Sequence, residues 1–321
     1  MGSLRSSHRP TATEQCRPSE HRCAYQPAAT SDDICTTLFA SLARRDQRQK
    51  GESYLRGLLA TRGRKSIRNI ATHLGGTAVE QSLQHFISSS TWDWMPVRAA
   101  LMTHLEGANV PLCYVVRSLC IPKSGEQSVG VSRGFDPRLG RTFRGQHAFG
   151  VWQTSASLSA PVNWRLHLPS RGLEERPRPG GIETAPGADT ETLEECAVEA
   201  ALSTLHRLGG TRKPVVLDVP VVQVESLLRR FTEADVPAVI RIHDRAQFVV
   251  DDTALPGCSG RSLTAQQILS SVRRLRRPAM WFDPGRPSAL RSSLVATVRI
   301  RLRPREVQTP DAFGMGGSSA R

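Results

Sequence analysis

The sequence predicts an α/β protein in which an N-terminal helical region precedes a domain built on a mixed sheet. Three observations support this fold class. Helical periodicity runs from Leu38 to Leu105, short β-prone segments follow between residues 112 and 168, and a strand–helix–strand unit comes after residue 191. With 39% hydrophobic residues, a chain of 321 residues can bury a core of this kind.

Composition divides the chain into four parts. Residues 1–34 mix Ser, Thr, Pro and Arg without periodicity, which predicts a disordered leader. We expect a helical region over 35–108, the mixed-sheet domain over 109–303 and a disordered tail over 304–321. Proline and glycine are frequent in 169–190, which indicates a loop insertion within the domain.

Two short helices joined by glycine are expected inside the helical region. Ser66 is placed to cap a helix whose apolar residues share one face over 67–74. Gly75-Gly76 ends that helix, and Thr77 with Glu80 forms a capping-box pattern that opens the next one. Two helices with such a tight turn resemble a helix-turn-helix.

Four cationic residues gather just before and within the first of these helices: Arg62, Arg64, Lys65 and Arg68. One interpretation is contact with DNA phosphates from the N-terminal end of a helix. The other is the solvated face of an ordinary helical bundle. Both stay open, because the sequence names no residue that would read a base.

A carboxylate stands at the end of the first strand of the later unit. The pattern predicts a helix over 191–208, a short apolar strand ending at Asp218, an amphipathic helix over 224–231 and a buried strand over 238–242. Ligands of open α/β sheets bind at the carboxyl ends of the strands. Asp218 is therefore a candidate site residue, and the alternative is a carboxylate that caps the next helix.

A final strand is expected over 294–302, where apolar and polar residues alternate strictly. Arg299, Arg301 and Arg303 should face outward, and a row of arginines can follow a phosphate backbone. Half-buried strands also carry solvated charge, so contact with DNA is one of two interpretations.

The chain is strongly basic, with a net charge of +14 and a pI of about 10.5. Such a surface attracts polyanions, of which nucleic acid is the commonest inside a cell, although the surface can also be basic without that partner. No apolar run approaches the ~20 residues of a membrane span, and residues 1–10 lack the apolar segment of a secretory signal. We expect a cytoplasmic, DNA-associated protein that binds double-stranded DNA and no membrane; homodimer formation stays open.

Several segments, taken together in their order and spacing, resemble DDE-type insertion-sequence transposases. The resemblance runs over roughly residues 38–302 and includes Pro-Lys-Ser-Gly at 122–125 and Ser-Val-Gly-Val at 128–131. Its other segments are 50–59, 64–71, 84–93, 150–152 and 161–166. The resemblance implies a ribonuclease-H-like mixed-sheet domain, a helical DNA-binding region before it and a role in DNA transposition.

The resemblance also implies an Asp, Asp, Glu set that holds two divalent ions, Mg²⁺ in an active enzyme. The first Asp should fall at Arg117 or Ser118 and is missing. The second matches Asp218, the one retained candidate for catalysis and for metal binding. The Glu should follow the 294–302 strand, but Glu306 is flanked by prolines and is not expected on a helix, so the chain resembles a C-terminally truncated member.

Three other groups could be considered as substitutes for the missing acids. Asp251-Asp252 comes after Asp218 in the chain and is better explained as a polar turn following a strand over 247–250. Asp136 and His147 are weaker alternatives. An arginine at 117 would remove a metal ligand, add positive charge and be able to pair with Asp218.

The leading hypothesis is a transposase-like DNA-binding protein that is catalytically degenerate. One alternative is an active transposase with an unusual acid set, which would need Mg²⁺. The other is a non-enzymatic DNA-binding regulator derived from a transposase.

Overall fold

The structure, a computed structural model, describes residues 31–123, 130–136, 140–168, 191–251, 255, 257–283 and 286–301. Residues 1–30 of the expected leader, the loop over 169–190, the tail and Glu306 lie outside the described residues. Residues 31–34, which were also expected to belong to the disordered leader, lie in the first helix instead. Within these ranges no helix combines the length and apolar character needed to cross a membrane.

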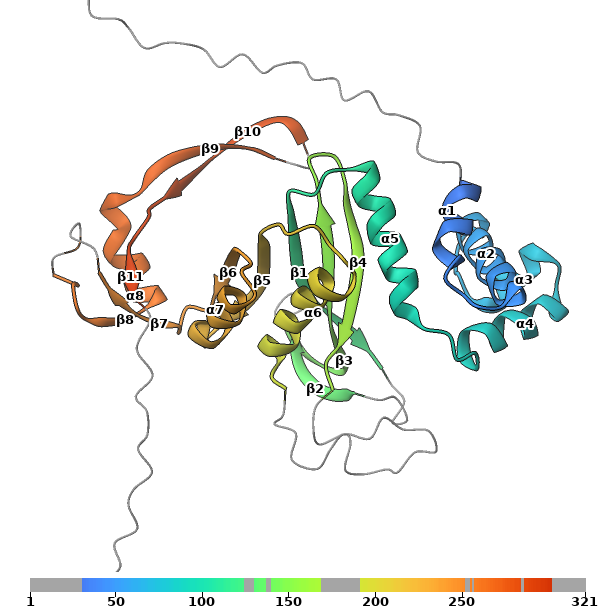
Figure 1. The fold of residues 1–321 in the computed structure, drawn as a ribbon. Coiled ribbons are helices and arrows are strands. Elements are labelled where there is room, and N and C mark those ends of the chain that lie inside the picture. The colour runs from blue at the N-terminus through green and yellow to red at the C-terminus, as the bar shows by residue number, and fades with distance from the viewer. Residues whose placement is uncertain are drawn as a thin grey trace, which may run out of the picture.

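Helices make up the N-terminal part of the described chain (Figure 1). They are α1 (Ser31–Phe39), α2 (Arg45–Ala60), α3 (Ile67–Leu74), α4 (Thr77–Ser88) and α5 (Trp94–Ala108). Ser66 caps α3 as predicted, because its side chain accepts a hydrogen bond from the backbone N–H of Asn69. Gly75 and Gly76 both take positive φ between α3 and α4, a conformation that favours glycine.

The capping box expected at Thr77 is wrong. The N-cap of α4 is Gly76, and no side chain caps this helix. Glu80 instead approaches Arg68 of α3, with 3.5 Å between Oε1 and Nε. The turn needs the positive φ of Gly76 at the N-cap position, so a capping side chain has no place there.

Helix α5 packs against both the helical region and the sheet. Its Val97 and Leu101 lie against a buried helical cluster that contains Leu38 and Phe86. Met102, one residue further on, is buried in the core that underlies the sheet. Because α5 is apolar on two sides, it holds the helical region against the sheet.

A six-stranded mixed sheet forms the centre of the fold. Its strands are β1 (Cys113–Pro122), β2 (Val131–Asp136), β3 (Arg141–Thr154), β4 (Ser159–Leu166), β5 (Val215–Val221) and β6 (Ala238–Ile242). Strand β3 pairs antiparallel with β1 on one edge and with β2 and β4 on the other. Beyond β1, strands β5 and β6 continue the sheet in parallel. This order is ribonuclease-H-like and confirms the predicted α/β fold.

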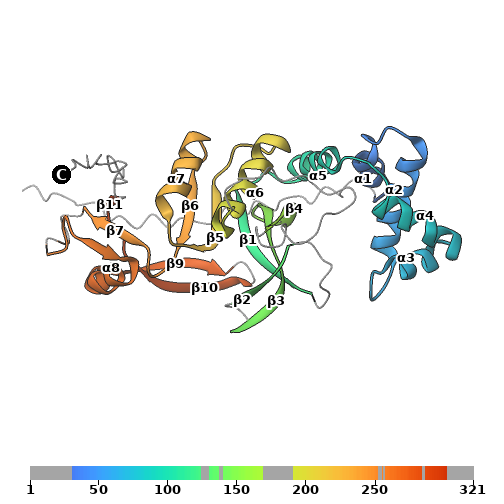
Figure 2. The ribbon, with the colours of Figure 1, turned by 90° about the horizontal axis from the view of Figure 1, so that it is seen from below.

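Two helices pack on one face of this sheet, α6 (Leu193–Arg207) and α7 (Val224–Glu233) (Figure 2). In α7 the predicted apolar face is buried, with Leu227 and Phe231 almost inaccessible. Helix α6 begins with a capping box formed by Thr192 and Glu195, which stand in the Thr-x-x-Glu spacing typical of this motif.

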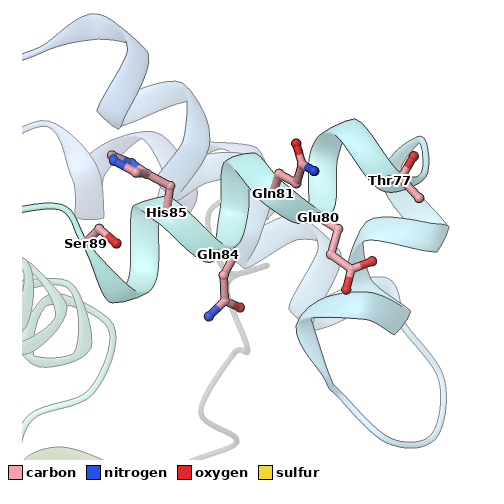
Figure 3. A pocket seen from close by; sticks show the side chains of 6 residues that line it. All are labelled: Thr77, Glu80, Gln81, Gln84, His85 and Ser89. Atoms are coloured by element: carbon pink, nitrogen blue, oxygen red, sulfur yellow. The ribbon is translucent and has the colours of Figure 1, made fainter.

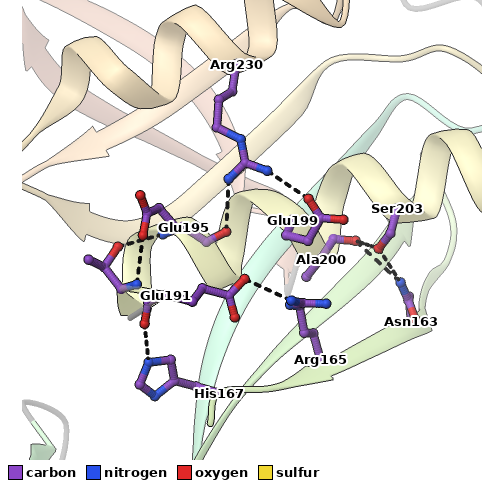
Figure 4. A network of polar contacts seen from close by, with 10 residues as sticks. Asn163, Arg165, His167, Glu191, Glu195, Glu199, Ala200, Ser203 and Arg230 are labelled. Carbon is purple, nitrogen blue, oxygen red and sulfur yellow. Dashed lines mark hydrogen bonds and ion pairs between the residues drawn. The ribbon is translucent and has the colours of Figure 1, made fainter. Parts of the chain in front are cut away.

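Ion pairs tie α6 to β4 and to α7 (Figure 4). Arg165 of β4 lies 2.9 Å from Glu191, which precedes α6. Arg230 of α7 lies 2.7 Å from Glu199 of α6. All four side chains are partly shielded from solvent, so these pairs hold α6 against β4 and against α7 more firmly than fully exposed pairs would.

The chain after β6 forms a small sheet and a separate hairpin. The elements are β7 (Gln247–Val250), β8 (Ser262–Thr264), α8 (Ala265–Ser271), a 3₁₀ turn (Val272–Leu275), β9 (Arg277–Asp283), β10 (Arg286–Val295) and β11 (Ile300–Arg301). The single strand expected over 294–302 is therefore wrong. Ala296 and Val298 do pack on the core, but Leu294 and Ile300 are exposed.

The β9–β10 hairpin projects from α8 as a long arm (Figure 1). Its register puts Pro278, Met280 and Phe282 of β9 on the same face as Leu290 and Leu294 of β10. The four larger side chains of this face are exposed. The arm thus presents an apolar surface that no other described element covers.

A hydrogen-bonded carboxylate joins α5, β1 and the segment before β5. Glu106 Oε1 accepts from the hydroxyl of Tyr114 at 2.6 Å and from the backbone N–H of Thr211 at 2.8 Å. Burial alone would raise the pKa of Glu106, but these hydrogen bonds and nearby Lys213 bring it below its ordinary value. Burial, and then the bond to Glu106, raises the pKa of Tyr114.

Glu106→Gln should therefore destabilise the fold in a pH-dependent way. Because the folded-state pKa lies below the ordinary value of 4.5, the charged carboxylate stabilises the protein above that pH. The contribution is lost as the pH falls through the folded-state pKa. Urea unfolding from about pH 7 to about pH 3 should show the largest wild-type advantage at neutral pH and a steadily smaller one as the pH falls below 4.5.

Glu225→Gln is the matched control, because Glu225 forms an exposed i,i+4 pair with Arg229. Its effect should be small at every pH. A Glu106→Gln effect that stays constant across the titration would contradict the role assigned to the charge.

Candidate functional site

The carboxylate of Asp218 is held by two guanidinium groups. Arg117 of β1 is the register partner of Asp218 in the parallel β1–β5 pair, and its Nε lies 2.9 Å from Oδ2. Arg241 of β6 approaches from the other side, with 3.1 Å between Nη1 and Oδ1. Both oxygens of the carboxylate therefore accept from arginine, as the sequence suggested for Arg117.

Arg117, and not Ser118, faces this carboxylate. Successive side chains of a strand point to opposite faces of the sheet, and Val116 is buried beneath the helices. Ser118 lies opposite the buried Phe149, so it shares the helix-covered face. Of the two positions at which the resemblance placed an acid, only 117 adjoins Asp218.

Two expectations for Asp218 need correction. Strand β5 continues beyond it to Val221, and Val219 and Val221 are buried, so Asp218 lies within the strand rather than at its end. The alternative role as a helix cap is also wrong. The N-cap of α7 is Gln223, and no side chain caps that helix.

The other carboxylates and the histidine do not join this site in the described structure. Asp251 follows β7, whereas Asp252 and the side chain of Asp136 lie outside the described residues, so the polar turn expected there stays a prediction. His147 is the register partner of Cys120 in the β1–β3 pair. It therefore projects from the face opposite to that of the two arginines.

The residues present do not fit a divalent ion. Mg²⁺ takes oxygen ligands and keeps several waters. Here both oxygens of the one carboxylate contact guanidinium groups, and the charges of the three side chains sum to +1. In the part of the chain that the structure describes, no group of three or more His, Cys, Asp or Glu side chains is placed to hold a metal.

The basic cluster of Arg62, Arg64, Lys65 and Arg68 lies in the loop before α3 and in its first turn, and all four side chains are exposed. The loop is fixed by one hydrogen bond from its Lys65 side chain and one to its Arg64 backbone. Lys65 donates to a carbonyl of α2, and Asn69 donates to the carbonyl of Arg64 at 2.7 Å. Among the described residues no carboxylate contacts Arg62 or Arg64, so their charge faces solvent.

Helix α4 adds a polar surface that the sequence alone did not reveal. A surface pocket on it is lined by Thr77, Glu80, Gln81, Gln84, His85 and Ser89 (Figure 3). Gln81, Gln84 and His85 are exposed there. Glutamine amides suit the edge of adenine, and spacing i, i+3, i+4 on the polar side of a helix is the signal that could have identified these residues.

Arg301 is engaged within the fold. Its Nε and Nη2 donate to the two oxygens of Asp251 at 2.7 and 2.8 Å. The hydrogen bond from Arg301 lowers the pKa of Asp251. Arg299 is exposed, and its backbone carbonyl accepts from the N–H of Asp251 at 3.0 Å. Contact of Arg299 or Arg301 with DNA stays a prediction.

The strand order of the six-stranded sheet, together with the helices that precede it in the chain, defines a ribonuclease-H-like α/β protein. A family model described as DDE superfamily endonuclease matches residues 37–305. The chain belongs to this family, which implies a transposase-like function with DNA as the partner. Members of the family generally depend on Mg²⁺. A search of curated proteins finds no match.

Proposed function

We propose that this protein is a DNA-binding, transposase-like member of the DDE superfamily that has lost metal-dependent strand cleavage. The contact of Asp218 with Arg117 and Arg241 carries the proposal. A metal at this place would have to displace two guanidinium groups from the carboxylate against their positive charge. DNA binding then remains as the proposed activity, and the proposed location of the protein is the cytoplasm, in association with DNA.

The basic cluster supports duplex binding by the helical region. Arg62 and Arg64 project into solvent next to the N-terminus of α3, whose free N–H groups favour anions. Helix α4 follows across the glycine turn with its glutamines exposed. The cluster would contact phosphates while α4 faces the bases, which are the two kinds of contact that a duplex offers.

Replacing Arg62 and Arg64 together with glutamine should weaken duplex binding about tenfold at moderate salt. The slope of log K against log[salt] should fall by about 1.8, because each phosphate contact contributes about 0.9. Fluorescence anisotropy with a labelled duplex measures both quantities. Arg44→Gln is the control, since Arg44 is also exposed but lies at the far end of α2, about 24 Å away.

Equal losses in the two variants would contradict a specific interface at the cluster. Nicking of supercoiled plasmid tests the other half of the proposal. Nicking that requires Mg²⁺ and disappears in Asp218→Ala would show that cleavage has been retained, whereas we expect none above background in either protein.

A further inference from the structure

A row of side chains crosses the sheet at the level of Asp218. Register pairs place Trp164 of β4 beside Gly150 of β3, Gly150 beside Arg117 of β1, and Arg117 beside Asp218 of β5. Arg241 of β6 completes the row through its contact with Asp218. With strands ~4.8 Å apart, the row spans about 19 Å across the sheet.

This row lies on the face that α6 and α7 leave open. The helices cover the side on which Val116 and Phe149 are buried. On the row, the side chains of Arg117 and Arg241 are 49% and 64% exposed, and Trp164 is 38% exposed. The row is therefore accessible from solvent.

Gly150 has no side chain, which leaves room over β3 for the ring of Trp164. A Cβ at position 150 would lie 2.6 Å from the ring of Trp152 and 2.8 Å from that of Trp164. The two indoles meet edge to face, with ring centroids 5.1 Å apart. Trp164 thus lies over the strand next to Arg117 and is held there by its neighbour.

The two guanidinium groups retain binding capacity. Each has five N–H donors, and the contacts with Asp218 use Nε of Arg117 and Nη1 of Arg241. The carboxylate fixes both side chains in place, which lowers the entropy lost when they bind a ligand. The net charge of the three groups is +1, which suits an anion and not a cation.

We propose that this row binds single-stranded DNA without metal, with Arg117 and Arg241 on successive backbone phosphates and Trp164 against a base. Guanidinium groups match phosphate geometry, and an exposed aromatic ring on an open sheet is a stacking platform for an unpaired base. A duplex offers no base face to Trp164. The inference uses the proposed function only in taking DNA as the polyanion, since it concerns another surface and another form of DNA.

The test measures anisotropy of labelled oligothymidylate in EDTA. The Arg117→Gln, Arg241→Gln double variant should bind about tenfold more weakly, and its salt slope should fall by about 1.4. Trp164→Ala should also cost about tenfold, and Trp164→Phe should restore most of the affinity. Arg212→Gln removes an exposed arginine that pairs with Asp235 outside the row, so it should change little. Circular dichroism excludes unfolded variants.

The outcomes separate this inference from the proposed function. If the row variants lose single-strand binding and keep duplex binding, that result supports single-strand binding by the row. It does so whether or not the Arg62 and Arg64 variants weaken duplex binding. Unchanged single-strand binding in those variants overturns the inference alone, while the Arg62 and Arg64 variants still decide the duplex interface. Single-strand binding by the wild type that requires Mg²⁺ also overturns it.

Discussion

Arg117→Asp is expected to create a divalent-metal site that the wild-type protein lacks. The substitution places a second carboxylate beside Asp218 on the same face of adjacent parallel strands. It changes the charge of the three side chains from +1 to −1. Two unit charges at ~4 Å from a divalent ion are worth about 4 kcal/mol even at the dielectric constant of water. Mn²⁺ affinity should rise about 100-fold or more, measured by titration calorimetry or by the electron paramagnetic resonance of free Mn²⁺.

Ser118→Asp is the matched control for this gain. It introduces the same carboxylate one residue further along β1, on the helix-covered face of the sheet. It should therefore create no site with Asp218. Tight Mn²⁺ binding by the wild type that depends on Asp218, or equal gains in both variants, would show that Arg117 does not exclude the metal.

Gly145→Ala is expected to destabilise the sheet severely, while Gly107→Ala should stabilise the protein. A Cβ at position 145 would lie under 3.0 Å from the backbone carbonyl of Ile121 in β1, and backbone cannot rotate away as a side chain can. A loss of about 3 kcal/mol follows from overpacking of this kind. Gly107 lies in α5 with open space around it, so alanine there should add about 0.5–1 kcal/mol.

Thermal and urea unfolding of the two variants measure these opposite signs. The pair is informative because both changes add one methyl group to a glycine. Equal effects, or a stable Gly145→Ala protein with unchanged sheet pairing, would contradict the close approach of β3 to β1.

Elements with a clear period were predictable from the sequence. Helix α7 follows the spacing of its apolar residues, and Ser66 caps α3 as its position indicated. Strand β6 covers the predicted residues 238–242, but the expectation that it is buried is wrong, because β6 is the last strand of the sheet and Val239 and Ile242 are exposed. The capping box at Thr77 failed because the conformation of the glycine turn overrides a capping pattern. The β9–β10 hairpin was missed because its apolar residues face solvent, so no contrast between buried and exposed positions marks it.

Only part of the candidate site could be predicted from the sequence, because the rest depends on how the strands pair. A missing acid could be assigned to 117 or 118, but their opposite faces become distinct only when the register of β1 against β5 is known. Arg241 could not be found at all. It reaches Asp218 because β6 lies next to β5, a pairing that local sequence does not encode.

The arm formed by β9 and β10 has a consequence for the colloidal behaviour of the protein. An isolated two-stranded ribbon with free edges and an apolar face is a template for edge-to-edge association. Mutual repulsion from a net charge of +14 opposes that association at low ionic strength. Added salt screens this repulsion without weakening apolar contacts. Salt is also what separates a basic protein from nucleic acid during purification. The same salt should therefore favour self-association of the protein through the β9–β10 ribbon.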